Sequence, residues 1–528
     1  MRRKRVFVLG GGCAGTAAAL ALSETPSLRR RFEVTVVERS WRLGGKGATG
    51  RDPARGWRIE EHGLHVWMGF YERTFAAIRG VLDELGSTGS PRLRGFDDAF
   101  TPRYAFSVWS GQGRSPWTLR LPPRPGLPGD GGPLPRFGAA DLARFVAAVG
   151  RSLPRSRRGA RLLADLVTLG AVAVRGSLAS ALRGESLDDH DLRGWLRHHG
   201  ASAATTHASV IRAFYDMTFA YPDGHSGPDR GAVAAGAALR SMLRILFTYR
   251  GAPFWLLRHG MGDTAFAPAY EVLRRRGVQF AWMHAVERLF PGPAGVEALS
   301  LRATPLSDHP MLLEHDGLQV WPNAPQVRPG PMSSVMLRRG EDFDALILAV
   351  PIPALHGPLA DLGTAHPHVQ RALERSASVA TRAAQVWTRR PVGLEGITTG
   401  FGRGFPTLAD LSEVLGSESW SGRDAPRGLT YLVDTTPDRD EQGAQEATSR
   451  WLRIMGHAET ETDRYVRVND HPADRYVLTL PGTVADRVAP EDDRIDNLRF
   501  AGDWTATSIN GGSVEAAFES GARAAASL

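Results

Sequence analysis

Short apolar runs flank a glycine-rich turn close to the start of the chain. The run "RVFVLG" (5–10) is apolar and rich in β-branched residues, which is typical of a buried parallel strand. The alanine-rich "GCAGTAAALALSE" (12–24) favours a helix, and "FEVTVVE" (32–38) predicts a second buried strand. Strand, turn, helix and strand in this order predict an α/β fold with a parallel sheet.

Similar patterns occur later in the chain. "LRFAGD" (498–503) predicts a strand that leads into a turn, and "GSVEAAFESGARAAA" (512–526) predicts a helix that begins near Ser513. Residues 260–289 predict a loop, a helix, a turn and one strand, and "FDALILAVP" (343–351) predicts a further buried strand. Residues 359–483 are expected to contain helices and strands without a recognisable motif.

The middle of the chain contains a linker and a basic, apolar segment. Residues 111–138 are rich in Pro and Gly and predict a loop or linker. Residues 151–184 carry seven arginines against one aspartate, with apolar residues at helical spacing. Two interpretations stay open: a basic amphipathic helix that rests on an anionic membrane, or a substrate-domain helix whose apolar face is core. The stretch 162–174 is shorter than the roughly 20 residues of a membrane span, so we expect no spanning helix.

Two neighbouring segments predict parts of a substrate domain. "SLDDHDLRGWLRHHG" (186–200) predicts a helix capped by Ser186. The aromatic residues of "IRAFYDMTFAYPDGHSG" (211–227) either line a substrate cavity or form plain core.

Composition narrows the class of protein. The 528 residues are 42% hydrophobic, which supports a large core and about three domains by length. Cys13 is the one cysteine, so no internal disulfide forms. No secretory signal follows "MRRKR". We therefore expect a cytoplasmic protein. The net charge of +8 comes almost wholly from arginine, and we find no nucleic-acid module, no zinc-type spacing and no repeat. We therefore expect neither a nucleic-acid partner nor a metal.

The amino-terminal turn has the spacing of a dinucleotide-binding loop. Gly10, Gly12 and Gly15 make G-x-G-x-x-G between the predicted strand and helix. The first glycine allows the tight turn, the second lets the backbone approach a pyrophosphate, and the third lets helix and strand pack closely. Glu38 ends the second strand about 20 residues later, where a carboxylate accepts hydrogen bonds from a ribose.

The segment after Glu38 is more specific. "ERSWRLGGKGATG" (38–50) resembles the FAD-dependent amine oxidase and phytoene desaturase superfamily, whose pattern is E-x-x-x-R-x-G-G-[KR]-x-x-[ST]. The matching positions are Glu38, Arg42, Gly44, Gly45, Lys46 and Thr49. The resemblance implies that Arg42 and Lys46 offset the pyrophosphate charge, that Gly44 and Gly45 pass close to the cofactor, and that Arg39 contacts it.

The carboxyl-terminal segment resembles the last FAD motif of the same superfamily, an A-G-D-x-T loop before a G-G-x-x-x-A helix. The resemblance implies cofactor contacts for Gly502, Asp503, Gly512, Ser513 and Val514, with the helix start directed at the flavin. It also implies that Val286 touches the adenine. The motif holds no cysteine, so we expect non-covalent FAD. Trp504, inside the loop, is a candidate catalytic residue.

One segment points to a branch of the superfamily. "EEHGLHVWMGFY" (60–71) resembles the E-x-G-L-H-[IV] segment of plant-type phytoene and zeta-carotene desaturases. His65 is therefore either a catalytic candidate beside the flavin or a core histidine that holds the loop. His62 is expected to face outward or to stabilise the turn. No lysine follows Lys46, so amine oxidation that relies on a lysine-held water is disfavoured.

These observations predict an α/β protein with a discontinuous, Rossmann-like FAD-binding domain and a second, α+β substrate domain. We expect the FAD-binding domain to comprise residues 1–100, 257–293, 337–358 and 484–528, and the substrate domain residues 101–256, 294–336 and 359–483. The implied function is an FAD-dependent oxidoreductase that removes hydride from a hydrophobic organic substrate, with oxygen or a quinone as acceptor. Alternatives are a redox-neutral polyene isomerase, a flavin monooxygenase and a non-enzymatic carrier of lipid or prenylated partners.

Overall fold

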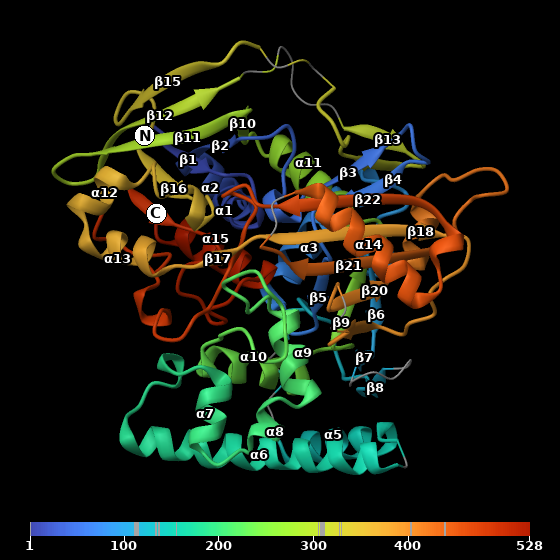
Figure 1. Cartoon of the computed structure of the whole chain (residues 1–528). Helices are drawn as coiled ribbons and strands as arrows, with labels where there is room; N and C mark the ends of the chain where they lie inside the picture. Colours follow the sequence, from blue (N-terminus) through green and yellow to red (C-terminus); the bar gives the residue numbers. More distant parts are fainter. Residues whose placement is uncertain are drawn as a thin grey trace.

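A parallel five-stranded sheet brings together strands from the two ends and the middle of the chain (Figure 1). The computed structural model describes residues 2–109, 116–132, 135, 138–154, 156–304, 306, 312–326, 328, 330–401, 404–437 and 440–528. The strand order is β10-β2-β1-β16-β24. The strands are β1 (Lys4–Leu9), β2 (Phe32–Glu38), β10 (Gln279–Trp282), β16 (Ala345–Leu348) and β24 (Leu498–Phe500).

Both faces of this sheet are buried, which explains its nearly continuous apolar strands. Val6 and Val8 face one cluster with α1 (Cys13–Leu22), α3 (Glu72–Leu85), α11 (Ala267–Arg275) and α15 (Val514–Ala526). Leu346 and Leu348 face the other cluster. That side is covered by β11 (His284–Pro291), β12 (Val296–Ala303), β15 (Ser333–Arg338), α12 (Ala360–Ala365) and α13 (Pro367–Arg375).

A second sheet has seven strands in the order β22-β18-β21-β20-β19-β7-β8. Its strands are β7 (Ala105–Val108), β8 (Trp117–Arg120), β18 (Thr381–Thr388), β19 (Ile397–Thr399), β20 (Thr407–Asp410), β21 (Gly428–Thr435) and β22 (Glu461–Asn469). Helix α14 (Glu441–Met455) packs Trp451 on Ala384 and Leu432 of one face. Because strand residues alternate between faces, Ala383 and Val433 are left to line a cavity on the other face.

A layer of helices lies at the lower edge of Figure 1, away from the five-stranded sheet. It contains α5 (Ala139–Ser152), α6 (Arg157–Arg183), α7 (Leu192–His198) and α8 (Ala203–Thr206), and α9 (Ser209–Met217) and α10 (Ala235–Phe247) lie between this layer and the sheets. Smaller elements are α2 (Pro26–Arg31), β3 (Thr49–Asp52), β4 (Arg58–Glu61), β5 (Val66–Met68), α4 (Phe96–Ala99), β6 (Phe100–Arg103), β9 (Phe254–Leu257), β13 (Leu313–His315), β14 (Leu318–Val320), β17 (Ser378–Val379) and β23 (Tyr476–Val477).

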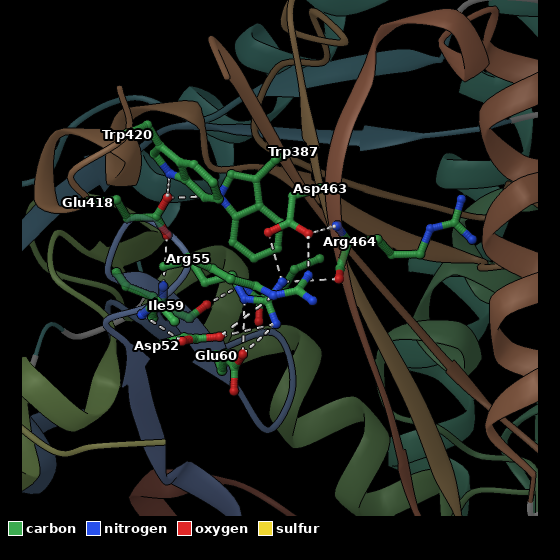
Figure 2. Close-up of polar contacts among 12 residues, drawn as sticks. Asp52, Arg55, Ile59, Glu60, Trp387, Glu418, Trp420, Asp463 and Arg464 are labelled. Carbon is green, nitrogen blue, oxygen red and sulfur yellow. Dashed lines mark hydrogen bonds and ion pairs between the residues drawn. The ribbon is translucent and has the colours of Figure 1, made fainter. Parts of the chain in front are cut away.

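A buried polar network, shown in Figure 2, joins the β3–β4 hairpin to the seven-stranded sheet. Arg58 Nη1 donates to Asp463 Oδ2 at 2.8 Å, and Arg58 Nη2 donates to Glu60 Oε1 at 2.6 Å. Glu418 accepts three N–H bonds, from the backbone of Ile59 and from the indoles of Trp387 and Trp420. Since each buried charge has a partner, the network fixes the hairpin against the sheet.

Several local predictions differ from the structure. Strand β8 lies inside the segment 111–138 that we expected to be a loop, and residues 111–115, 133, 134, 136 and 137 of that segment lie outside the described residues. Ser186 caps a short 3-10 turn rather than the following helix. Helix α7 is capped instead by Asp191, whose carboxylate accepts from the N–H groups of Arg193 and Gly194.

The single strand predicted at the end of 260–289 is two strands. Met283 has φ 59°, and it separates β10 from β11. The reason is topological, because β10 pairs with β2 in the parallel sheet whereas β11 pairs with β12 in an antiparallel one. The basic segment 151–184 likewise spans two helices, since α5 ends at Ser152 and α6 begins at Arg157.

Candidate functional site

One cavity of about 790 Å³ is bordered by the five-stranded sheet's loops and by the seven-stranded sheet. Segments from both ends of the chain line it. Of the residues singled out from the sequence, the cavity is lined by Gly10, Gly12, Glu38, Arg39, Gly44, Gly45, Lys46, His65, Val286, Gly502, Asp503, Trp504, Gly512, Ser513 and Val514. Gly15 and Arg42 do not line it.

The first glycine turn combines tight packing with open space. A Cβ at Gly15 would lie 1.7 Å from the carbonyl oxygen of Gly10, so Gly15 lets α1 pack on the turn. A Cβ at Gly12 would meet no protein atom closer than 3.8 Å, so cavity space borders this position. No described side chain caps the amino terminus of α1. Its first N–H groups can therefore bind an anion such as a pyrophosphate.

Glu38 stands at the carboxyl end of β2, beside the glycine turn. Its Oε2 accepts from Gly11 N and its Oε1 from Ser40 N, both at 2.8 Å. Burial raises the pKa of Glu38, although Arg39 and these two hydrogen bonds oppose that effect. The two backbone bonds fix the orientation of the carboxylate, and its unused lone pairs suit a ribose diol.

Lys46 and Asp503 connect the two cofactor motifs. Lys46 Nζ donates to Asp503 Oδ2 at 2.9 Å, with side chains 24% and 12% exposed. The turn that carries Lys46 is tied to the first glycine turn, because Gly44 N donates to Gly11 O at 2.9 Å. Cys13 lines the same region, and burial together with the charge of Asp503 raises the pKa of its thiol to about 12. The thiol is therefore neutral at physiological pH.

The start of α15 faces the cavity. Ser513 is its N-cap and accepts from Ala516 N at 3.1 Å, as the sequence predicted. Tyr476 donates its hydroxyl to Gly512 O at 2.6 Å, which fixes the preceding turn. Glu515 turns away and accepts from the N–H groups of Arg73 and Thr74 at the start of α3. The remaining positive end of the α15 dipole is suited to an anionic ring edge.

Val286 lies on β11 and lines the cavity together with Arg302 of the neighbouring strand. Met283 N donates to Ser40 O at 3.3 Å, so β11 begins beside the turn that carries Glu38. Val286 therefore lines the cavity near the turn of Glu38, and its contact with an adenine stays a prediction.

The two arginines of the second motif have different surroundings. Arg39 lines the cavity and its Nη2 donates to Asp474 Oδ1 at 2.5 Å. Arg42 was expected to offset the pyrophosphate charge, but the structure places its side chain outside the lining of the cavity. Its Nη1 donates to Pro322 O at 3.3 Å and its guanidinium lies over the ring of Trp41. Arg42 therefore fastens the turn to the loop that contains Pro322.

His65 lines the cavity and is held from both ring nitrogens. Nδ1 is 2.6 Å from Glu61 Oε2, and Nε2 is 3.1 Å from the carbonyl oxygen of Lys46. Since a carbonyl and a carboxylate only accept, His65 carries two protons or Glu61 carries one. Burial lowers the pKa of His65, but the charge and hydrogen bond of Glu61 outweigh it, so the net shift is upward. His65 therefore has the contacts of a histidine that holds the loop, and it also borders the cavity as a catalytic candidate would.

His62 does not face outward, which leaves the second of the two expectations, a role in the turn. It is 7% exposed and lines the cavity, with Nε2 3.8 Å from Asp474 Oδ1. Burial lowers its pKa to about 4, so the ring is neutral. Its carbonyl accepts from Asn469 Nδ2 at 2.9 Å, which agrees with a role in the turn.

Trp504 lines the cavity but is only 2% exposed. Its indole N–H donates to Val350 O at 3.1 Å, and its ring packs edge-on against Phe500. These contacts describe a side chain that fixes the loop before Asp503, so they assign Trp504 a packing role.

The part of the cavity beside the seven-stranded sheet is apolar. It is lined by Leu64, Val66, Met68, Met217, Phe219, Ala383, Ile397 and Val433, with Thr381, Arg382 and Thr407. Met217 and Phe219 come from the aromatic segment 211–227, whereas Tyr215 and Tyr221 are buried in core. Part of that segment therefore lines the cavity and part of it is core, so each interpretation holds for some of its residues.

Sequence reasoning missed the residues that β18–β23 contribute, including Asp474, Tyr476 and Arg382. They belong to no motif, and their positions follow from how the second sheet packs. No local pattern in the sequence marks Asp474 as a cavity residue.

The fold and the site define a Rossmann-like dinucleotide-binding protein. The residues fit FAD, because the cavity combines an uncapped helix terminus, an open glycine edge and a carboxylate at the strand end. Residues 8–85 match a family model described as an NAD(P)-binding Rossmann-like domain, and residues 324–528 match one described as flavin containing amine oxidoreductase. The two family matches together indicate a protein of the FAD-dependent amine oxidase superfamily, with FAD as its cofactor.

Solved structures share the fold over almost the whole chain. An oxidoreductase from Methanosarcina mazei has 11% identity and a TM-score of 0.59, covering 98% of both chains. Putrescine oxidase bound to putrescine has 16% identity and a TM-score of 0.56, covering 99% of this chain and 98% of that one. A putative protoporphyrinogen oxidase from Exiguobacterium sp. 255-15 has 13% identity and a TM-score of 0.57, covering 99% and 97%.

A curated relative matches a short stretch. The carotenoid phi-ring synthase of Chlorobaculum tepidum is 41% identical over 80 residues, which is 14% of this chain. The match spans only 10% of that protein's own length.

Proposed function

We propose that this protein is an FAD-dependent oxidoreductase of the desaturase or dehydrogenase type, acting on a hydrophobic organic substrate. The observation that carries the proposal is the composition of one cavity. Its cofactor end is bordered by both glycine motifs, Glu38 and the start of α15. Its other end is bordered by apolar side chains from α9 and the seven-stranded sheet. A substrate held at the apolar end would lie against the cofactor.

FAD, when bound, supplies the acceptor for a hydride taken from a C–H bond. The chain's own residues provide the setting. The start of α15, with Ser513 as N-cap, presents backbone N–H groups and a positive dipole end to negative charge. The apolar wall excludes water from the reacting bond. His65 and Glu61 share a hydrogen bond at the edge of the cavity, so the pair can hold a proton there.

Two observations support a polyene or related lipid-soluble compound as substrate. The carotenoid relative's name points in that direction, and the wall beside the seven-stranded sheet is mostly apolar. The chain has no lysine after Lys46, which argues against oxidation of an amine by a lysine-held water. We propose oxygen or a quinone as the electron acceptor, because such apolar molecules can enter a cavity that is lined by apolar side chains.

Anaerobic mixing of the purified flavoprotein with a panel of polyenes, terpenoids and aromatic compounds tests the proposal. A substrate should abolish the oxidised-flavin absorbance, and oxygen or a quinone should restore it while an unsaturated product accumulates. A polyene that is isomerised without lasting bleaching would contradict net oxidation. Product formation only with stoichiometric NADPH consumption would indicate a monooxygenase instead.

A further inference from the structure

The outer faces of α5 and α6 form an exposed apolar surface, here called the basal surface. Eleven large hydrophobic side chains are exposed in the described part of the chain, and seven of them lie on these two helices. They are Leu142, Val146, Leu163, Val167, Val174, Leu178 and Leu182, with 44% to 89% exposure. Both helices run along the lower edge of Figure 1. Concentrated apolar exposure of this kind marks an interaction surface.

The exposed side of α6 has helical periodicity. Positions 160, 164, 167, 171, 174, 178 and 181 are all Ala, Val or Leu and are exposed. Such spacing gives one continuous stripe along a helix of 27 residues, about 40 Å long. The inner face of this helix is core, as Leu162 and Val172 show, whereas the stripe on its outer face is exposed.

Helix α6 lies lengthwise on the protein. A Cβ at Gly176 would lie 2.7 Å from the ring of Trp195, and the Trp195 indole donates to Ser180 Oγ at 3.3 Å. The stretch Gly159–Arg183 is long and apolar enough to cross a membrane, contrary to the sequence expectation. Because α7 and α8 cover its inner face, α6 in this arrangement is suited to lie in the plane of a membrane surface.

The charges around the stripe are mostly positive. Among the described side chains of α5 and α6, five are arginines and two are aspartates. The arginines are Arg144, Arg151, Arg161, Arg175 and Arg183, all exposed. Of the aspartates, Asp141 already pairs with Arg124 and Arg144. An apolar stripe bordered by arginines complements a bilayer with anionic headgroups.

A second cavity adjoins the cofactor cavity. It measures about 120 Å³ and shares Met68, Tyr71, Met217 and Tyr476 with the large cavity. Its far end is bordered by Ala237, Ala238, Ser241 and Ile245 of α10. Helix α10 packs on α5, where Phe145 contacts Phe247 at a ring distance of 5.2 Å. The second cavity therefore lies between the candidate substrate site and α10, the helix that packs on α5.

We propose that the basal surface docks on an anionic phospholipid bilayer and that the second cavity is the entrance for a lipid-soluble substrate. The proposed docking is argued from the exposed stripe and the charges around it. The proposed entrance for substrate rests in addition on the proposed function.

Co-sedimentation of the flavin-loaded protein with vesicles tests the docking. The wild type should bind vesicles of phosphatidylcholine with phosphatidylglycerol more tightly than phosphatidylcholine alone. The triple variant Val167→Glu/Val174→Glu/Leu178→Glu should lose at least tenfold in binding to the anionic vesicles. Met336→Glu and Ile454→Glu, which change exposed apolar residues elsewhere, are matched controls and should bind like the wild type. Circular dichroism and flavin content show that every variant is folded.

Two results would overturn the docking. One is a flavin-loaded wild type that does not co-sediment with anionic vesicles. The other is a triple variant that binds them like the wild type. A dimer that the triple variant dissociates, without vesicle binding, would assign the surface to a second copy of the chain. Vesicle binding by a protein whose flavin no substrate reduces would contradict the proposed function and leave the docking intact.

Discussion

Lys46 Nζ lies 2.9 Å from Asp503 Oδ2, although the two residues are 457 positions apart in the chain. Lys46 belongs to the turn tied to the first glycine loop, and Asp503 follows the last strand of the parallel sheet. Their ion pair therefore holds the amino- and carboxyl-terminal cofactor motifs at one cavity. Both side chains border that cavity, so Lys46 can also contact a bound phosphate while Asp503 holds it in place.

Asp503→Asn should weaken FAD binding by about tenfold or more. The change removes the ion pair that holds the two cofactor motifs together, and losing a largely buried charged hydrogen bond costs about 1–3 kcal/mol. Fluorescence titration of the apoprotein with FAD measures the effect. Lys46→Met/Asp503→Leu serves as the control, because it removes both charges. Equal affinity in Asp503→Asn and the wild type would show that the pair has no part in the cofactor site.

Gly12→Leu should purify without flavin and still fold. A Cβ here would meet no protein atom closer than 3.8 Å, and Gly12 lines the cavity, so the larger side chain should occupy cavity space. The ratio of flavin to protein absorbance measures the loss, and circular dichroism measures folding. Gly80→Leu, on the exposed side of α3, is the matched control and should keep its flavin. Full flavin content in Gly12→Leu would place the cofactor elsewhere.

Sequence alone predicted the parallel sheet and the cofactor end of the cavity because glycines and a strand-end acid leave local signals. Gly10, Gly12 and Ser513 stand where those signals indicated. Arg42 was misassigned because its motif position gives no information about rotamer, and Pro322 accepts its hydrogen bond.

The substrate end could not be predicted in the same way. Met217, Ala383 and Asp474 border the cavity only because the seven-stranded sheet packs beside the parallel one. Such tertiary contacts leave no pattern in neighbouring residues. The exposed stripe on α6 illustrates the same limit, since helical spacing shows that a face is apolar but not whether protein covers it.

Gly521→Ala should destabilise the protein by about 1–3 kcal/mol, because a Cβ there would lie 2.1 Å from Ala14 O. Gly521 lies where α15 packs on α1, so the variant strains the contact between the two ends of the chain. Chemical denaturation measures the change. Gly80→Ala, with no atom within 4 Å of the new Cβ, should instead stabilise by about 0.5–1 kcal/mol. Similar effects of the two variants would contradict the close packing of α1 on α15.

Arg51→Met should destabilise by about 3–5 kcal/mol. Arg51 and Asp263 are fully buried and paired at 2.8 Å, so the variant leaves a buried carboxylate without its cation. Burial already raises the pKa of Asp263 to about 6, against the lowering effect of Arg51. Arg51→Met/Asp263→Leu removes both charges and should recover much of the loss. A double variant less stable than Arg51→Met would refute this explanation.

The stability difference between the wild type and His65→Gln should depend on pH. The folded protein holds the pKa of His65 above its ordinary 6.5, chiefly through the charge and hydrogen bond of Glu61 against the effect of burial. The proton-linked stabilisation is therefore complete below pH 6.5 and is lost as the pH rises through the folded pKa. Unfolding free energies measured across this range should converge at high pH. A difference that grows with pH would mean that His65 is held neutral.

A crystal structure of the purified, yellow protein is the most direct test of the shared cofactor cavity. It should show one FAD whose ribose contacts Glu38, whose pyrophosphate lies against Gly12 and whose flavin ring meets the start of α15 at Val514. Density for a flavin that touches only one of the two terminal motifs, or crystals of a colourless protein grown with excess FAD, would contradict it.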